Sequence, residues 1–401
     1  MVQIKQKPQL HASWIDPHAK EIVRTLQKEG FISYLVGGCV RDLLAGIHPK
    51  DFDIATNAEP NQIRRKIWGS YVIGKRFRLV LVKRRDQQYE VATFRREAPV
   101  DVIAELSSEV SESEEAKTTE DIQTAGGLDK PAIQGDNFFG TPEQDAVRRD
   151  FTINALFYDP IKDELIDYIK GIEDIKSQTL RMIGDPDARI IEDPIRSFRA
   201  IRLAHKLGFR IESNLRTAIL KNASSVTKSV LPRRREEYLK FLRLNDPVPA
   251  WMELYDLGII EHALPSLLPV FEDNERRELF FHYIYRLKEL CSNLQDSNEL
   301  FAPLILGYLR AMQDHPEREI LLGKLLKDEL MLFKSEQAII FGSLDLVENL
   351  NLVNNFKKRG SRRQQAFLKN ELLPMALKIA QVEHAVSPTV LQFWREQIHL
   401  L

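Results

Sequence analysis

The pattern of apolar and polar positions changes character at about residue 180. Before that point, an amphipathic helical pattern over residues 17–29 ends at Gly30 and is followed by short runs rich in Val, Ile, Tyr and Phe. These runs predict strands and short helices in alternation. We expect strands at 31–36, 51–55, 71–73, 78–84, 89–94, 152–159 and 165–169, and helices at 42–45 and 60–68. From Gly171 onward the apolar spacing is helical almost to the end.

The pattern is lost between Ala98 and Asp136, where acidic residues are interleaved with Ser, Thr and Gly. Apolar residues are too sparse there to offset the entropy cost of ordering the chain. We predict a disordered acidic insertion, 98–136, and favour a tolerated loop over a segment that repels nucleic acid or fences a site. The chain then divides into a mixed α/β head over 12–180, a helical neck over 181–245 and a helical body and tail over 246–401.

Composition and charge exclude some classes of protein without selecting one. Lys plus Arg (57) nearly balances Asp plus Glu (58), so net charge gives no support for a nucleic-acid partner. Two cysteines are too few for a disulfide framework or a cysteine-based zinc site. The N-terminus lacks an apolar signal core, and no apolar run is long enough to span a membrane. We therefore expect a cytoplasmic protein without a membrane partner.

Two aspartates near the start carry the clearest chemical signal. Asp51 and Asp53 are two residues apart, so on a strand both carboxylates project from one face. Adjacent carboxylates repel each other unless a cation lies between them, and Mg²⁺ prefers oxygen ligands. Upstream, Gly37-Gly38 follows an apolar strand and precedes a helix, where the backbone can approach a phosphate. A metal-binding pair beside such a turn indicates nucleotide chemistry.

Two further segments combine arginine with aspartate. Arg148-Arg149-Asp150 precedes the predicted hairpin, and guanidinium groups match phosphate oxygens, whereas Asp150 can orient Arg149 or contact a ribose hydroxyl. Asp193 and Arg196 open a helix, where Asp193 is either an ordinary N-cap before Pro194 or one half of an acceptor–donor pair that reads a nucleobase edge. The helix then separates a basic face from an apolar one, respectively Arg196, Arg199 and Arg202, and Phe198, Ile201, Ala204 and Leu207.

The spacing of these motifs resembles a known superfamily. Twelve residues (39–50) separate Gly38 from the Asp-x-Asp motif, and this arrangement is similar to the nucleotidyltransferases that include DNA polymerase β. The resemblance implies that the glycine backbone meets a triphosphate and that the aspartates hold two Mg²⁺ ions. It also implies a third carboxylate on an adjacent strand. Glu90, which opens the apolar run that ends at Phe94, is the candidate.

Four segments in order sharpen the resemblance: 35–42, 51–53, 148–154 and 192–196. Together they look like the motifs of the class II tRNA nucleotidyltransferase and bacterial poly(A) polymerase family, over about residues 10–240. The implied fold is an α/β head of the polymerase β type followed by an all-α neck, body and tail. The implied roles are metal ligation by Asp51 and Asp53 with Glu90 completing the acidic set, triphosphate contact by Gly37, Gly38 and Arg41, phosphate and ribose contact by Arg149 and Asp150, base recognition by Asp193 and Arg196, and phosphate contact by Arg199.

The active-site motifs do not separate the two activities of this family, but flanking segments favour one. Residues 72–82, with basic residues after a glycine, and residues 136–145 and 231–240 resemble the poly(A) polymerase branch, and no His-Asp dipeptide occurs. Ser197-Phe198 departs from the Met-Leu that the family often has. We predict an ATP-dependent, template-independent RNA adenylyltransferase that extends 3′ ends of mRNA or other RNAs. The alternatives are CCA addition to tRNA and a non-catalytic RNA-binding protein on the same scaffold.

Three basic clusters are candidate RNA contacts, because lysine and arginine bind phosphates without reading sequence. Each is equally typical of a solvated surface. The clusters are Lys75, Arg76 and Arg78 in the head, Arg233, Arg234 and Arg235 between neck and body, and Lys357, Lys358, Arg359, Arg362 and Arg363 in the tail.

Overall fold

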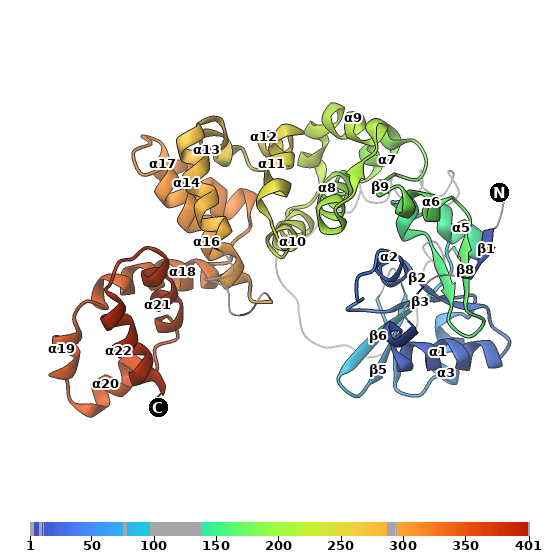
Figure 1. Ribbon diagram of the computed structural model, residues 1–401, viewed down its shortest axis with the longest axis horizontal. Helices are drawn as coiled ribbons and strands as arrows, with labels where there is room; N and C mark the ends of the chain where they lie inside the picture. The colour runs from blue at the N-terminus through green and yellow to red at the C-terminus, as the bar shows by residue number, and fades with distance from the viewer. Residues whose placement is uncertain are drawn as a thin grey trace, which may run out of the picture. The chain divides into compact units, whose positions relative to one another are not determined.

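The computed structural model describes residues 4–7, 10, 12–74, 78–96, 138–286, 293 and 295–399. The predicted insertion, 98–136, and two members of the head cluster, Lys75 and Arg76, lie outside the described residues. The chain forms two compact units, Met1–Pro186 and Asp187–Leu401, which we call the head unit and the helical unit (Figure 1).

The head unit is built on a mixed eight-stranded sheet with the strand order β1-β8-β7-β2-β3-β6-β5-β4. Most neighbouring strands are antiparallel, but β3 and β6 run parallel, so the chain crosses over between them. The strands are β1 (Ile4–Gln6), β2 (Ser33–Val36), β3 (Asp53–Thr56), β4 (Ser70–Ile73), β5 (Leu79–Arg84), β6 (Gln87–Thr93), β7 (Phe157–Asp159) and β8 (Glu164–Asp167), and the short β9 (Thr179–Leu180) follows.

Helices pack on both faces of this sheet. The head helices are α1 (Pro17–Lys28), α2 (Gly38–Leu44), α3 (Pro60–Lys66), α5 (Pro142–Val147) and α6 (Gly171–Lys176). Helix α1 begins at Pro17 because the Asp16 carboxylate accepts hydrogen bonds from the first backbone N–H groups, and it buries the apolar stripe that its sequence predicts. The main core joins α1 and α3 to one sheet face, and a second core with Ala146 of α5 covers part of the other.

Hydrogen bonds close the two ends of the segment 97–137 against each other. Arg95 and Phe139 form an antiparallel bridge, the Arg96 N–H donates to the Phe138 carbonyl at 2.9 Å, and the Gly140 N–H donates to the Phe94 carbonyl at 2.8 Å. The chain therefore leaves β6 and returns toward α5 at one point of the head unit.

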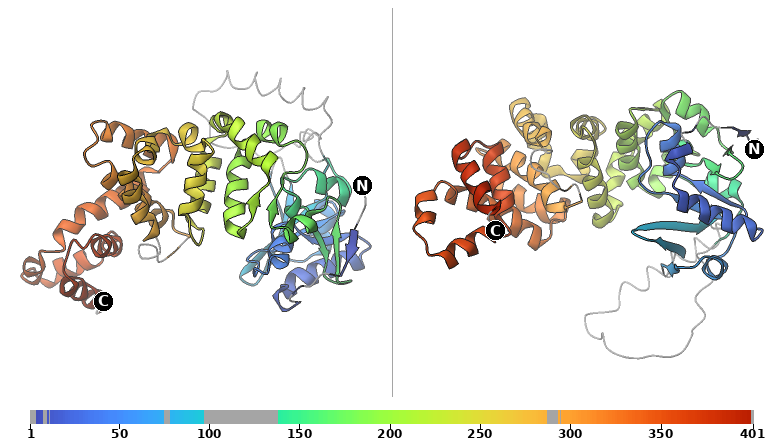
Figure 2. Two further views of the ribbon diagram at one scale, coloured as in Figure 1. Left: turned by 45° about the horizontal axis from the view of Figure 1, so that its top comes forward. Right: turned by 60° about the horizontal axis from the view of Figure 1, so that its bottom comes forward.

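The helical unit has the predicted all-α character (Figure 2). Its core is apolar and aromatic, with Trp251 and Tyr238 fully buried. Apart from the two-residue β10 (Arg210–Ile211), its main elements are α7 (Pro186–Glu192), α8 (Ile195–Leu207), α9 (Ser213–Lys221), α10 (Leu231–Leu242), α11 (Val248–Asp256), α12 (Ile259–Ala263), α13 (Leu268–Glu272), α14 (Asn274–Tyr285), α16 (Ser297–Ala311), α17 (Arg318–Lys324), a π-helical turn (Leu325–Glu329), α18 (Lys334–Asn349), α19 (Val353–Lys357), α20 (Ser361–Leu368), α21 (Leu373–Val382) and α22 (Pro388–His399).

Several strands are shorter than predicted, and the late starts of two of them, β3 and β7, change where site residues lie. The strand predicted from Asp51 begins at Asp53, because its partner β2 ends at Val36, which pairs with Asp53. The strand predicted from Thr152 begins at Phe157, since residues 152–154 form a 3₁₀ turn that buries Asn154.

Candidate active site

Two carboxylates meet at the centre of the head sheet. Asp53 opens β3 and lies opposite Glu90 on the parallel neighbour β6, so the predicted third acid is adjacent to the first. Asp51 lies just ahead of the strand and not within it, and all three acids are exposed. Although solvent reaches Asp53, the crowding of protein atoms, followed by the charges of Glu90 and Asp51, raises the pKa of Asp53 to about 6 against the opposing charge of Arg149.

This donor set fits a divalent cation. Oxygen ligands that repel one another are stabilised by a hard cation such as Mg²⁺, which commonly takes one or two carboxylates and completes its shell with substrate phosphates. Within the described ranges, no three Asp, Glu, His or Cys side chains are grouped closely enough to hold a metal ion by themselves. Asp51 and Asp53 therefore suit a site that a substrate phosphate completes.

The glycine turn lies beside these acids. Gly37 precedes α2 with φ +75° and ψ −128°, a backbone conformation that side chains rarely adopt. A Cβ atom at Gly37 would lie 3.1 Å from Nη1 of Arg149, so the missing side chain leaves room for that guanidinium. Gly38 is the first residue of α2. The turn thus brings backbone amides and an arginine together near Asp53.

Arg41 is only 6% exposed. Its guanidinium donates to Oδ1 of Asp42 at 2.5 and 2.8 Å and to Oδ1 of Asn154 at 2.7 Å. The structure therefore shows Arg41 bracing α2 against residues 152–154, and its contact with a triphosphate stays a prediction.

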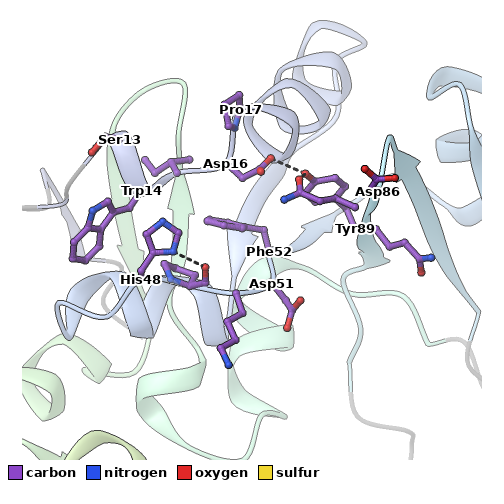
Figure 3. A pocket seen from close by; sticks show the side chains of 14 residues that line it. Ser13, Trp14, Asp16, Pro17, His48, Asp51, Phe52, Asp86 and Tyr89 are labelled. Atoms are coloured by element: carbon purple, nitrogen blue, oxygen red, sulfur yellow. Dashed lines mark hydrogen bonds between the residues drawn. The ribbon is translucent and has the colours of Figure 1, made fainter. Parts of the chain in front are cut away.

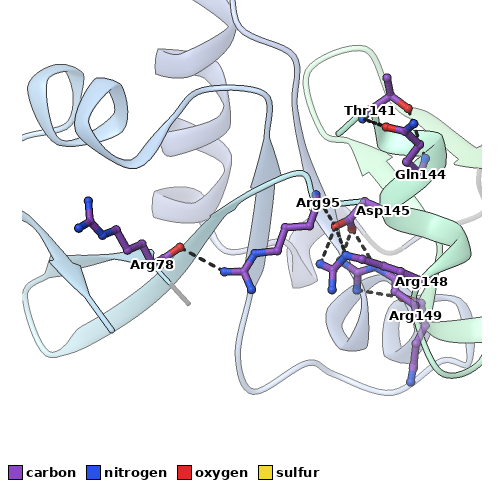
Figure 4. Close-up of polar contacts among 8 residues, drawn as sticks. Arg78, Arg95, Thr141, Gln144, Asp145, Arg148 and Arg149 are labelled. Carbon is purple, nitrogen blue, oxygen red and sulfur yellow. Dashed lines mark hydrogen bonds and ion pairs between the residues drawn. The ribbon is translucent and has the colours of Figure 1, made fainter. Parts of the chain in front are cut away.

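Asp145 organises the predicted arginine motif (Figure 4). This carboxylate is 1% exposed and accepts from Arg148 at 2.6 and 3.0 Å, from Arg149 at 2.9 and 3.1 Å and from the Arg95 backbone N–H at 3.1 Å. Burial alone would raise the pKa of Asp145, but the charges of Arg149 and Arg148 outweigh it, and the pKa lies below its usual value. Arg149 is thereby held in one orientation.

Asn154 is the second residue that ties the motif together. Its carbonyl accepts from Nη1 of Arg149 at 3.2 Å, its side-chain oxygen accepts from Arg41, and its Nδ2 donates to Oδ1 of Asp150 at 3.1 Å. Our sequence reasoning gave no role to Asp145 or Asn154. The four-residue spacing between Asp145, in α5, and Arg149, just beyond the end of α5, was the available signal for Asp145, whereas Asn154 carried none.

Asp51 also lines a cavity of about 480 Å³ in the head unit (Figure 3). Trp14 and His48, whose ring centroids are 5.6 Å apart, lie at one side of it, and Tyr89 and Asp86 lie at the other. The Tyr89 hydroxyl donates to Asp16 at 2.8 Å and thereby fixes the wall nearest to α1.

In the helical unit the predicted base-recognition pair is joined only by a backbone hydrogen bond among the described contacts, from the Arg196 N–H to the Asp193 carbonyl at 3.0 Å, and the two side chains have other partners. Asp193 accepts two hydrogen bonds from Arg233, at 2.8 and 2.9 Å, whereas Arg196 donates to Glu192 at 2.5 Å and to the Arg189 carbonyl at 2.6 Å. The N-cap interpretation of Asp193 is wrong, because α8 begins at Ile195 after Pro194 and has no side-chain cap. Arg199 follows on α8 and is half-buried.

Two basic clusters differ in what their side chains do. Arg235 is 6% exposed, pairs with Glu336 at 2.6 Å and lies against the Phe301 and Phe333 rings, so the prediction that 233–235 is an RNA-binding cluster is wrong for Arg235. Position 235 falls on the buried side of α10. The run of three arginines in the sequence gives no sign of this burial. All five basic residues of the tail cluster are exposed, and their RNA contact stays a prediction.

Two known protein families match this chain, one within the head unit and one within the helical unit. Residues 33–181 match the family described as "Poly A polymerase head domain", and residues 208–270 match "Probable RNA and SrmB- binding site of polymerase A". Poly(A) polymerase I of Haemophilus influenzae is 39% identical over 260 residues, 64% of this chain and 53% of that protein. The CCA-adding enzyme of Enterococcus faecalis is 35% identical over 224 residues, 56% of this chain and 48% of that protein.

Solved structures support the fold. The Thermotoga maritima CCA-adding enzyme complexed with tRNA-CCA aligns over 99% of this chain and 86% of its own, with a TM-score of 0.59 and 20% identity. The predicted fold, an α/β nucleotidyltransferase head followed by helices, is confirmed. The chain spans about half the length of the curated relatives it matches. None of the helices that the structure describes is both long and apolar enough to cross a lipid bilayer.

Proposed function

The chain belongs to the family of bacterial poly(A) polymerases and CCA-adding enzymes, and from this premise we propose that it is a template-independent RNA adenylyltransferase. The RNA 3′ hydroxyl attacks the α-phosphate of ATP in line, and pyrophosphate leaves. The observation that carries the proposal is the pairing of Asp53 with Glu90 beside Arg149 and the Gly37 turn. Acids and phosphate-binding groups thus face one point of the sheet.

Each group in the head unit has a distinct task. Asp51 and Asp53 would hold Mg²⁺, with Glu90 completing the acidic set, and the chemistry that the ion would supply is activation of the attacking hydroxyl and charge neutralisation of the departing pyrophosphate. The Gly37-Gly38 backbone and Arg149 bind the triphosphate, and Asp145 keeps the Arg149 fork in place.

The remaining groups orient the nucleotide. Asp150 contacts the ribose, Asp193 and Arg196 address the base, and Arg199 contacts phosphate. Because Arg233 occupies both Asp193 oxygens, base recognition by Asp193 requires Arg233 to move aside or to share the carboxylate. Arg233 is thereby a candidate for regulating access to the base-recognition residue.

Adenylyl transfer is favoured over CCA addition by sequence similarity. The poly(A) polymerase relatives are 36–39% identical over 260 residues, whereas the CCA-adding relatives are 32–35% identical over 222–270 residues. The two activities share the site described above, so this preference depends on the sequence as a whole and on the flanking segments.

Primer extension with single nucleotides tests the proposal. A generic RNA oligonucleotide is incubated with Mg²⁺ and one of ATP, CTP, GTP or UTP, and product length is measured on a denaturing gel. We expect long products with ATP alone. Efficient CTP incorporation, or extension only of tRNA that lacks its 3′ end, would replace our proposal by CCA addition. RNA binding without pyrophosphate release from any nucleotide would favour the non-catalytic alternative.

A further inference from the structure

A row of side chains leads from the acids to the edge of the head sheet. Asp53 is opposite Glu90, Glu90 is opposite Leu81 on β5, and Leu81 is opposite Tyr71 on β4. Residues directly opposite each other in a sheet project from the same face. The four side chains therefore form one row across β3, β6, β5 and β4.

The outer part of this row is exposed, in contrast to the reverse side of the same strands. Tyr71 is 56% exposed and Ile73, two residues further along β4, is 40% exposed. On the reverse side, Val80 and Val82 are fully buried in the core to which α3 contributes. An exposed tyrosine and isoleucine two residues apart on an edge strand form a small apolar surface that a partner can contact.

A cation accompanies the exposed ring. Lys83 on β5 is exposed, and its ammonium lies 5.9 Å from the centroid of the Tyr71 ring. Lys83 is opposite Gln88 on β6, which places it two residues from the Leu81–Glu90 pair. An aromatic face next to a lysine is the combination that binds single-stranded nucleic acid, with bases on the ring and phosphate at the ammonium.

The geometry of the reaction decides which substrate reaches this surface. Gly37 directly follows β2, and Arg149 lies against it, so the triphosphate groups are on the β2 side of Asp53. In-line transfer places the attacking and leaving oxygens on opposite sides of the phosphorus atom. The attacking 3′ hydroxyl must then approach from the Glu90 side, where β5 and β4 continue the sheet.

We propose that the exposed face of β5 and β4 is a platform for the RNA segment just upstream of the 3′ terminus, with Tyr71 stacking on a base and Lys83 contacting a phosphate. Three strand spacings separate Asp53 from Tyr71, roughly 14 Å, so the stacked base lies a few nucleotides before the terminus. Stacking on tyrosine accepts any base, as an enzyme that extends varied RNAs requires. This inference rests on the proposed function.

The test compares a long and a short primer. Affinity for a fluorescein-labelled 12-nucleotide RNA is measured by anisotropy without nucleoside triphosphate, and KM and kcat are measured for the 12-mer, a dinucleotide primer and ATP. For Tyr71→Ala we expect about 5- to 50-fold weaker binding and a matching rise in the KM of the 12-mer. The kcat, the KM of ATP and the KM of the dinucleotide should stay unchanged.

Conservative and distant variants provide the controls. Tyr71→Phe keeps the ring and should behave as wild type. Lys83→Gln should weaken 12-mer binding and reduce its salt dependence by about one charge. Lys162→Gln removes an exposed lysine from the β7–β8 turn, at another part of the head unit, and should change none of these values. Thermal unfolding of each variant establishes that the fold is kept.

Three results would overturn the platform. The first is wild-type affinity of Tyr71→Ala for the 12-mer, and the second is a raised KM for ATP, which would assign this face to the nucleotide. The third is a raised 12-mer KM in His48→Ala but not in Tyr71→Ala, which would route RNA through the cavity beside Asp51. Because affinity is measured without ATP, normal RNA binding without ATP incorporation contradicts the proposed function and still tests the platform.

Discussion

The head unit contains two groups of charged residues that differ in how their charges are balanced. Around Asp53, carboxylates face one another, and the pKa of Asp53 is raised to about 6 by desolvation and by Glu90 and Asp51. Around Asp145, one carboxylate is shared by Arg148 and Arg149. Despite burial, the pKa of Asp145 is lowered by these arginines.

The contrast between the two groups indicates different roles, ligand binding for the group around Asp53 and structural support for the group around Asp145. A carboxylate whose neighbours are also acidic is stabilised by a cation that arrives with the substrate. A carboxylate already surrounded by hydrogen-bond donors has its interactions satisfied within the protein. The Asp53 group is thus expected to affect chemistry with little effect on folding. The Asp145 group is expected to affect folding first and chemistry through Arg149.

Asp53→Asn should give the largest effect on activity. Loss of one metal-binding carboxylate removes several kcal/mol of transition-state stabilisation, so kcat/KM for ATP should fall about 10³-fold. The unfolding midpoint in urea should not decrease, because a repelling charge is removed. Asp86→Asn, an exposed acid at the β5–β6 turn, serves as the control and should keep its activity. Near-normal extension of RNA by Asp53→Asn would show that the metal assignment is wrong.

Asp145→Ala should show the reverse pattern. Removal of this buried carboxylate takes one acceptor from each of two arginines and from the Arg95 N–H, at a cost of about 2–3 kcal/mol in the free energy of unfolding. Glu143→Ala changes an acid on the same helix, and its effect should stay within about 0.5 kcal/mol. Urea denaturation followed by circular dichroism measures both. Equal stability of the two variants would contradict the supporting role of Asp145.

Gly37→Ala probes the point where the two groups meet. The new Cβ combines an unfavourable φ of +75° with a 3.1 Å approach to Arg149, for a cost of roughly 1–3 kcal/mol. Gly46 has a similar φ of +72°, but an added Cβ would meet no other atom there. Gly46→Ala therefore measures the cost of the backbone conformation alone. We expect Gly37→Ala to raise the KM for ATP, and Gly46→Ala to leave it unchanged. An identical KM in both variants would remove Gly37 from the nucleotide site.

The two pKa shifts predict opposite dependences of stability on pH. Because the pKa of Asp53 rises from 3.8 to about 6 on folding, its contribution is present below pH 4 and is lost as the pH rises through 6. The lowered pKa of Asp145 gives stability that is present above its unfolded pKa and is lost at lower pH, below about 3.8. Urea denaturation of wild type and Asp53→Asn without divalent cations, from pH 4 to 7.5, measures the first dependence.

Mg²⁺ should restore the stability that wild type loses as the pH rises to 7.5, because only the folded state offers the metal site. It should have no such effect at pH 4.5, where Asp53 is protonated. Parallel stability profiles for wild type and Asp53→Asn across this range would contradict the raised pKa.

Arg233→Gln should have the smallest effect on folding. In its ion pair with Asp193 the Arg233 side chain is exposed and that of Asp193 is half-buried, and surface pairs contribute about 0–1 kcal/mol. The variant frees the Asp193 carboxylate, so the ratio of ATP to CTP incorporation is the sensitive readout. A change in that ratio without loss of stability would support Asp193 as the base-reading residue. An unchanged ratio would indicate that Arg233 does not control access to Asp193.

Local patterns predicted the elements well, but not the partners of individual side chains. The alternation in β5 and β6 and the stripe of α1 are readable because burial repeats with the period of the element. The resemblance to polymerase β nominated Glu90, and the parallel register then placed it opposite Asp53. The ion pair of buried Arg235 joins residues 101 positions apart in the chain, and the hydrogen bonds of Arg233 with Asp193 join residues 40 positions apart. No local sequence pattern contains such contacts.

The closed base of the segment 97–137 makes this place suitable for protein engineering. The hydrogen bonds at Arg96 and Gly140 fix both ends of the segment in the head unit, so a change in its length need not shift the sheet or Asp145. Each doubling of a flexible loop adds only about 0.6 kcal/mol to its closure cost. A reporter domain or an affinity tag can be introduced there, several residues along the chain from every group assigned to catalysis.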